Sequence, residues 1–180
     1  MTKNLYQEYQ SQKIKEVILY VLSKTGSIGY FRLMKTLFCA DRQNLLKWGD
    51  QITCLDYYAR MHGPVPATVF DNIVSVYQGV KSDYSDIVSV KGNYVVRANR
   101  LPNMDYLSET DIDSIDKAID ELKGKNRDQI EQYLHESVYK RILATKGQHY
   151  SLTDIAESGG ASDNVITNIN NQERLLKALS

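Results

Sequence analysis

The sequence feature that most constrains the fold is the GPVP stretch at residues 63–66, which directly follows an aromatic-rich segment. A proline fixes its own φ and disfavours helical geometry at the residue before it, so a helix cannot run through this stretch. Glycine, in contrast, tolerates backbone angles that other residues avoid. We therefore expect Gly63, Pro64 and Pro66 to form a stiff elbow that fixes the direction of a helix over about residues 66–78.

Two helices are predicted before the elbow. Apolar residues recur at i, i+3, i+4 and i+7 over residues 12–24 and again over residues 30–48, a spacing typical of helices with one buried face. Gly49 follows the second run at the position where a glycine commonly ends a helix.

Asp41 lies on the apolar face of the second predicted helix. Burying an unpaired carboxylate there would cost a prohibitive amount of free energy. We therefore expect Asp41 to accept hydrogen bonds from nearby backbone N–H groups, from His62 or from Arg60. His135 is expected to approach the same centre, and together these groups would form a polar knot that holds the elbow.

After the elbow helix the pattern changes to strands and then returns to helices. Residues 86–99 alternate in polarity around Gly92 and Asn93, which is typical of a β-hairpin with a two-residue turn. Later helices have capping residues at Ser108 and Asn126. We predict an α+β fold, predominantly α-helical: a single compact helical domain with one β-hairpin.

Bulk properties exclude several classes of function. The 180 residues include 22 basic and 22 acidic side chains, so no overall positive field favours nucleic acid or a membrane surface. The N-terminal segment is polar, and the longest apolar run, residues 17–22, is too short for a signal peptide or a membrane span. We therefore expect a cytoplasmic protein that does not bind membranes.

Neither a metal site nor a catalytic constellation is indicated. The two cysteines, Cys39 and Cys54, and the three histidines have no spacing typical of zinc ligands, and we expect no cofactor. A cysteine nucleophile paired with His62 or His135 is conceivable, but neither cysteine lies in a recognisable nucleophile turn. We therefore predict that the protein is not an enzyme, with a cysteine hydrolase as a minor alternative.

Residues 151–180 are predicted to form a pair of helices that packs on the rest of the domain. Their spacing of small and apolar residues resembles a helix-turn-helix, which makes a DNA-binding regulator the main alternative function. A DNA reader needs cations for the phosphates. This segment holds two basic residues, Arg174 and Lys177, against four acidic ones, which disfavours nucleic acid as a partner.

Several motifs occur in a fixed order along the chain. They are KTLFCAD at residues 35–41, WGDQIT at residues 48–53, a tyrosine at 57 or 58 followed by GPVP, and HESVY at residues 135–139. In this order and spacing the sequence resembles the Panacea domain, the domain of SocA-like antitoxins and phage-associated relatives, over roughly residues 14–139. Two positions depart from the usual pattern, because Cys39 replaces an aromatic residue and Tyr139 replaces a tryptophan.

The resemblance implies an antitoxin of a toxin-antitoxin system, prophage-associated, which binds and neutralises a cognate toxin encoded by an adjacent gene and has no enzymatic activity. It implies one Panacea-like domain over residues 1–180 and leaves open whether copies of the chain form a homo-oligomer. The residues expected to form its structural or partner-binding motif are Lys35, Asp41, Tyr58, His62, Gly63, Pro64, Pro66, His135 and Tyr139.

Overall fold

The computed structural model describes residues 5–179, and the predicted fold class is confirmed: the protein is α+β and predominantly helical. The described residues form eight α-helices and one short 3₁₀ helix, η1. They are α1 (Leu5–Thr25), α2 (Tyr30–Trp48), α3 (Ala67–Tyr77), η1 (Met104–Tyr106), α4 (Glu109–Leu122), α5 (Arg127–Leu134), α6 (Ser137–Leu143), α7 (Leu152–Ser158) and α8 (Asp163–Leu179).

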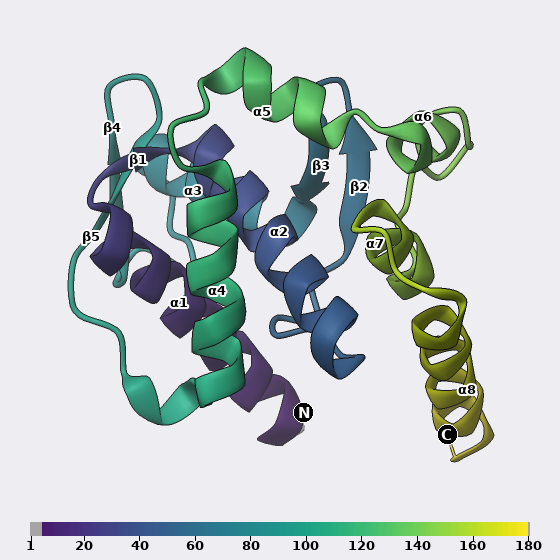
Figure 1. Ribbon diagram of the computed structural model, residues 1–180. Helices are drawn as coiled ribbons and strands as arrows, with labels where there is room; N and C mark the ends of the chain where they lie inside the picture. Colours follow the sequence, from purple (N-terminus) through teal and green to yellow (C-terminus); the bar gives the residue numbers. More distant parts are fainter. Residues whose placement is uncertain (1–4, 180) are drawn as a thin grey trace.

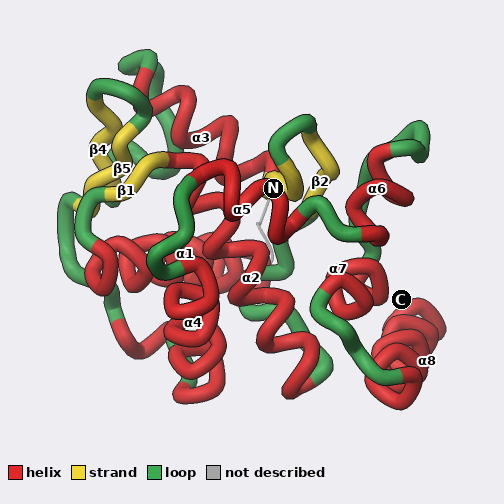
Figure 2. The backbone as a smooth tube through the Cα atoms, turned by 45° about the horizontal axis from the view of Figure 1, so that its top comes forward, coloured by secondary structure: helices red, strands yellow, loops and turns green. Residues whose placement is uncertain are grey.

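The strands form two separate antiparallel sheets (Figure 2). One sheet has the order β1-β5-β4, and the other is the hairpin β2-β3. The strands are β1 (Ile28–Gly29), β2 (Tyr57–Arg60), β3 (Gly63–Pro66), β4 (Val88–Lys91) and β5 (Val95–Ala98).

Helix α2 lies at the centre of the molecule, between α1 and α4 on one side and the β2-β3 hairpin and α7 on the other (Figure 1). Its apolar residues Leu33, Leu37, Phe38 and Leu45 are fully or almost fully buried. Because α2 contacts helices α1, α3, α4 and α7 and strands β1 and β3, a group on this helix can fix the position of several segments at once.

Local sequence signals predicted several boundaries correctly. The second helix covers residues 30–48, and Gly49 ends it in the left-handed conformation with φ of 78°. The cap residues Ser108 and Asn126 both form capping boxes, in which side chain and backbone bond reciprocally. The first helix begins earlier than predicted, at Leu5, because its first turns are polar and exposed and therefore lack an apolar stripe.

The strands differ from the prediction in two ways. The β4-β5 turn has three residues rather than two, because Lys91 pairs with Val95, and both Gly92 and Tyr94 have positive φ. The GPVP stretch is itself a strand, so the molecule has a second hairpin that was not predicted. Pro66 precedes α3 as its N-cap residue instead of lying in its first turn.

The C-terminal helices pack in sequence against the body of the molecule. Helix α7 contacts α2 and α6, while α8 contacts α7 and lies at the edge of the molecule (Figure 1). The approach to α2 is close, because a Cβ atom on Gly159 would lie 2.7 Å from Leu46 Cδ1. None of the helices within residues 5–179 is long and apolar enough to cross a bilayer.

Candidate functional site

The GPVP stretch pairs with β2 through a turn of two residues, Met61 and His62. Alternate residues of a strand direct their N–H groups to opposite edges. Pro64 and Pro66 are two residues apart, so both positions without an N–H face the edge away from β2, and Gly63 and Val65 remain free to pair with it. The spacing of the two prolines thus permits a strand that the prolines alone would argue against.

Asp41 anchors the segment that leads into this hairpin. Its side chain is 0% exposed. Oδ1 accepts from the backbone N–H of Ile52 at 2.9 Å and of Thr53 at 3.0 Å, while Oδ2 accepts from the hydroxyl of Tyr57 at 2.7 Å and from the Thr53 hydroxyl. The predicted backbone donors are therefore present, and the carboxylate is fully enclosed by four hydrogen bonds.

Two opposed effects act on the pKa of Asp41. Burial raises this pKa to about 6, while the hydrogen bonds from Thr53, Tyr57 and Ile52 lower it. Burial also raises the pKa of Tyr57 well above its usual value, so its hydroxyl keeps the proton that it donates to Asp41. The prediction named Tyr58, but Tyr57 is the tyrosine that faces the carboxylate. Tyr58 points the other way and its ring packs on His149.

Lys35, six residues before Asp41 on α2, reaches the other end of the hairpin. Its ammonium is buried, with the residue 1% exposed, and Nζ donates to the Pro64 carbonyl at 2.8 Å. Burial lowers the pKa of Lys35 to about 7. A Cβ atom on Gly63 would lie 3.2 Å from this Nζ, and Gly63 has a φ of 94°, so both space and backbone conformation favour glycine there.

His135 and Tyr139 complete the cluster at the hairpin tip. Their rings stack at a centroid distance of 4.1 Å, and the Tyr139 hydroxyl donates to the Arg60 carbonyl at 2.8 Å. Burial lowers the pKa of His135. His62 Nδ1 forms an ion pair with Glu131 when the imidazole is protonated.

The predicted single knot is therefore two clusters. The expectation that His62, Arg60 and His135 would surround Asp41 is wrong, because all three lie at the hairpin tip together with Lys35. Asp41 instead bonds to the loop before β2 and to the first residue of that strand, Tyr57. Sequence reasoning missed this division because both clusters draw on the same helix and the same motif.

A pocket of about 420 Å³ opens beside the hairpin, and we call it the hairpin pocket. Its walls come from α2, the hairpin, α3 and the start of α5. The lining is mostly apolar, with Tyr30, Phe31, Met34, Val65 and Phe70. Its charged side chains are Lys35, Arg60, Asp71 and Arg127.

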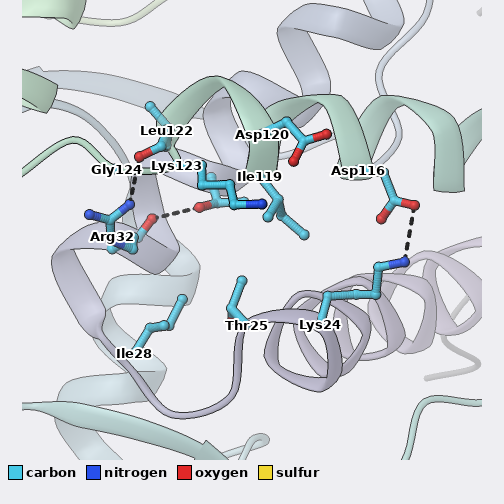
Figure 3. A pocket seen from close by; sticks show the side chains of 11 residues that line it. Lys24, Thr25, Ile28, Arg32, Asp116, Ile119, Asp120, Leu122, Lys123 and Gly124 are labelled. Carbon is cyan, nitrogen blue, oxygen red and sulfur yellow. Dashed lines mark hydrogen bonds and ion pairs between the residues drawn. The ribbon is translucent and has the colours of Figure 1, made fainter.

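A second pocket, of about 540 Å³, lies between α1, α2 and α4 (Figure 3). There the cations have partners: Lys24 binds Asp116 at 3.2 Å, and Arg32 donates to the Leu122 carbonyl at 2.9 Å. The remaining charges, Lys123 and Asp120, are of opposite sign. The lining of this pocket therefore has three cations against two carboxylates, whereas that of the hairpin pocket has three cations against one.

The cysteines have environments that differ from those of a nucleophile. Cys39 is buried in α2, and burial raises its pKa to about 12, so it remains a thiol at neutral pH. Cys54 is exposed, and partial desolvation together with the charges of Asp50 and Asp41 raises the pKa of its thiol. Within residues 5–179 no group of three or more His, Cys, Asp or Glu side chains is placed to hold a metal ion.

The α7-α8 pair shows how the helix-turn-helix spacing is used. Val165 and Ile166 pack against the core, and Ile169 is buried. Arg174 is exposed, and the side chain of Lys177 lies outside the described part of the chain. The described surface of α8 therefore presents few cations for a phosphate backbone.

Comparison with known proteins gives one match. A family model described as "Antitoxin SocA-like, Panacea domain" matches residues 33–138, more than half of the chain. The matched segment runs from α2 into α6 and contains Lys35, Asp41, the hairpin and His135, while Tyr139 lies one residue beyond it. Searches of curated proteins and of solved structures found no match.

Proposed function

The chain belongs to the SocA-like antitoxin family with a Panacea domain, as its motifs predicted, and from this membership we propose that it neutralises a toxin protein by binding it directly. The family match carries the proposal. It falls on the segment that builds the hairpin and, except for Tyr139, both of its anchoring clusters.

The anchored hairpin supports a binding role. Asp41 fixes the loop before β2, and Lys35 with Tyr139 fixes the tip, so the hairpin is held at both ends. A surface fixed before binding loses less conformational entropy when a partner docks. The proposal needs no catalytic step and no cofactor from this chain.

The finer parts of the proposal concern the setting. We infer that the toxin is encoded by an adjacent gene in a prophage-associated pair, and that both proteins act in the cytoplasm. One domain over residues 1–180, with residues 151–180 packed on it, would form the binding unit. The motif residues named from the sequence, with Tyr57 in addition, would shape its surface.

Co-expression tests the proposal. The product of the adjacent gene is expressed alone and together with the full chain, and growth and co-purification are measured. We expect the product alone to arrest growth, and co-expression to restore growth with both proteins recovered in one complex. A neighbouring product that is harmless alone and never co-purifies would contradict the proposal.

A gel-shift assay with DNA upstream of the gene separates this function from that of a helix-turn-helix regulator. We expect no sequence-specific shift for the chain alone. A specific shift that weakens steeply with salt would instead favour the regulator, because phosphate contacts release counterions.

A further inference from the structure

The hairpin pocket contains cations that lack acidic partners. Within residues 5–179, neither Lys35 nor Arg127 has a carboxylate within ion-pair distance. Both lie over the ring of Phe31, with Lys35 Nζ 5.1 Å and Arg127 Cζ 4.8 Å from its centroid. An ammonium has three N–H donors, and the Pro64 carbonyl is the one hydrogen-bond acceptor that the described residues give Lys35. A buried cation with spare donors is costly unless something else satisfies it.

The acidic residues near the pocket do not balance these cations. Asp71 is the one carboxylate of the lining, and Glu131, whose charge acts against the burial of Lys35 by raising the pKa of that amine, forms its ion pair with His62. Arg60, at the hairpin tip, donates to the neutral side chain of Gln148. The lining of the hairpin pocket therefore has two more cations than carboxylates, whereas that of the pocket in Figure 3 has one more.

The rest of the pocket is suited to an apolar side chain. Met34 and Phe70 line its wall, and its volume of about 420 Å³ is in the range of ligand sites, about 300 to 1,000 Å³. Met61, in the hairpin turn, is 75% exposed at the rim and extends the apolar surface beyond the pocket. An occupant that covers Met61 as well must be larger than the pocket, which favours a polypeptide over a small metabolite.

We propose that the hairpin pocket is the docking site for an acidic segment of the toxin, in which a carboxylate stands next to a large apolar side chain. This inference rests on the proposed function. The carboxylate accepts hydrogen bonds from the guanidinium of Arg127 and from the free donors of Lys35. The apolar side chain packs on Met34 and Phe70, and the neighbouring part of the segment covers Met61.

Charge reversal at Arg127 tests the proposal in the full chain. Arg127 is exposed in the first position of α5, where a negative charge is favourable to the helix, so Arg127→Glu leaves folding intact. Lys123→Glu is the matched control, because it makes the same change of charge four residues away at the pocket of Figure 3. Melting curves of both variants verify the fold.

Affinity for the tagged product of the adjacent gene is then measured. We expect Arg127→Glu to weaken binding at least about tenfold, and Lys123→Glu to leave it within about twofold. Met61→Ser, which changes an exposed turn residue, should weaken binding about threefold to tenfold. Overlapping short peptides of the same product identify the segment: those that bind should contain Asp or Glu next to a large apolar residue, and should lose binding to Arg127→Glu.

The outcomes separate this inference from the proposed function. If the wild-type chain restores growth and binds the product, but Arg127→Glu and Met61→Ser bind equally well, the docking site is wrong and the antitoxin function stands. Peptides that bind through Lys or Arg would also overturn the inference. If the wild-type chain neither restores growth nor binds the product, the proposed function fails, and this inference with it.

Discussion

Two of the buried charges on α2, Asp41 and Lys35, anchor the hairpin, and their surroundings differ. Asp41 is enclosed by four hydrogen-bond donors, whereas Lys35 has one hydrogen-bond acceptor among the described residues and lines a mostly apolar pocket. A fully satisfied buried charge specifies one local structure. A buried charge with spare donors keeps the capacity to bind a further group. The comparison therefore supports a mainly structural role for the Asp41 end of the hairpin and the binding role proposed above for the Lys35 end.

The largest loss of stability is expected for Asp41→Ala. The variant leaves the N–H groups of Ile52 and Thr53 and the hydroxyl of Tyr57 without their acceptor, and each buried donor left unsatisfied costs about 1 to 3 kcal/mol. We expect a total loss of at least about 2 kcal/mol, which lowers Tm by roughly 4 to 8 °C in a chain of this size. Thermal melts followed by circular dichroism measure it.

Asp41→Asn serves as the matched variant for this prediction. It keeps the shape and one acceptor oxygen but places an amide NH₂ against one set of donors, so it should lose less than the alanine variant. An unchanged Tm for both variants would show that the hydrogen bonds to Asp41 do not stabilise the fold.

A smaller loss, about 1 to 3 kcal/mol, is expected for Gly63→Ala. The new Cβ would meet Lys35 Nζ at 3.2 Å in a backbone conformation with φ of 94°. Gly26→Ala is the control, because Gly26 also has positive φ, 73°, but has open space around it. Urea unfolding of both variants separates backbone strain from contact with Lys35, and equal losses would mean that the contact is unimportant.

The next largest loss of stability is expected for Tyr139→Phe, which removes the hydroxyl that donates to the Arg60 carbonyl. The net loss for one such bond is about 0.5 to 1.5 kcal/mol. Tyr58→Phe is the matched change on strand β2, which α6 contacts. The Tyr58 ring is half-exposed and packs on His149, so this variant should lose less stability. If Tyr58→Phe were the more damaging of the two, the hairpin would be anchored by other contacts.

The fold was predictable from sequence where the signals are local. The stripe of α2 ends at Gly49, and the capping boxes at Ser108 and Asn126 each lie within four residues, so helix boundaries could be derived without tertiary information. The two-residue strand β1 could not, because it exists only by pairing with β5, about 65 residues away. The β2-β3 hairpin was hidden because prolines normally argue against a strand.

The site was predictable to a similar degree. Burial of Asp41 and its backbone donors followed from its place on an apolar stripe. The choice of Tyr57 over Tyr58 depends on which face of β2 meets α2, which the sequence alone does not specify. Lys35 and Tyr139 bond to backbone carbonyls, and a carbonyl acceptor has no sequence signature, so their separate cluster could not be foreseen.

The smallest change in stability at neutral pH is expected for Lys35→Met, and the sign of this change depends on pH. Burial lowers the pKa of Lys35 from its ordinary value of 10.5 to about 7, so between these values the unfolded chain holds a proton that the folded chain lacks. Stability contributed by Lys35 therefore rises as pH increases from about 7 to about 10.5. The neutral amine still donates a hydrogen bond to the Pro64 carbonyl. Methionine has a similar volume but neither titrates nor donates a hydrogen bond.

The contribution of Asp41 to stability changes with pH in the opposite direction and over a different pH range. Its pKa is raised from 3.8 to about 6, so the folded chain binds a proton more tightly. The contribution of Asp41 to stability therefore falls as pH increases from about 4 to about 6.

The pKa values of two other groups near Lys35 are also shifted: burial lowers the pKa of His135 below its usual 6.5 and raises that of Cys39 to about 12. Urea unfolding at pH 5, 7 and 9 should therefore show wild type gaining on Lys35→Met between pH 7 and 9 and not between pH 5 and 7. A difference that stays constant with pH would mean that Lys35 is not desolvated, which would remove the contrast between the two ends of the hairpin.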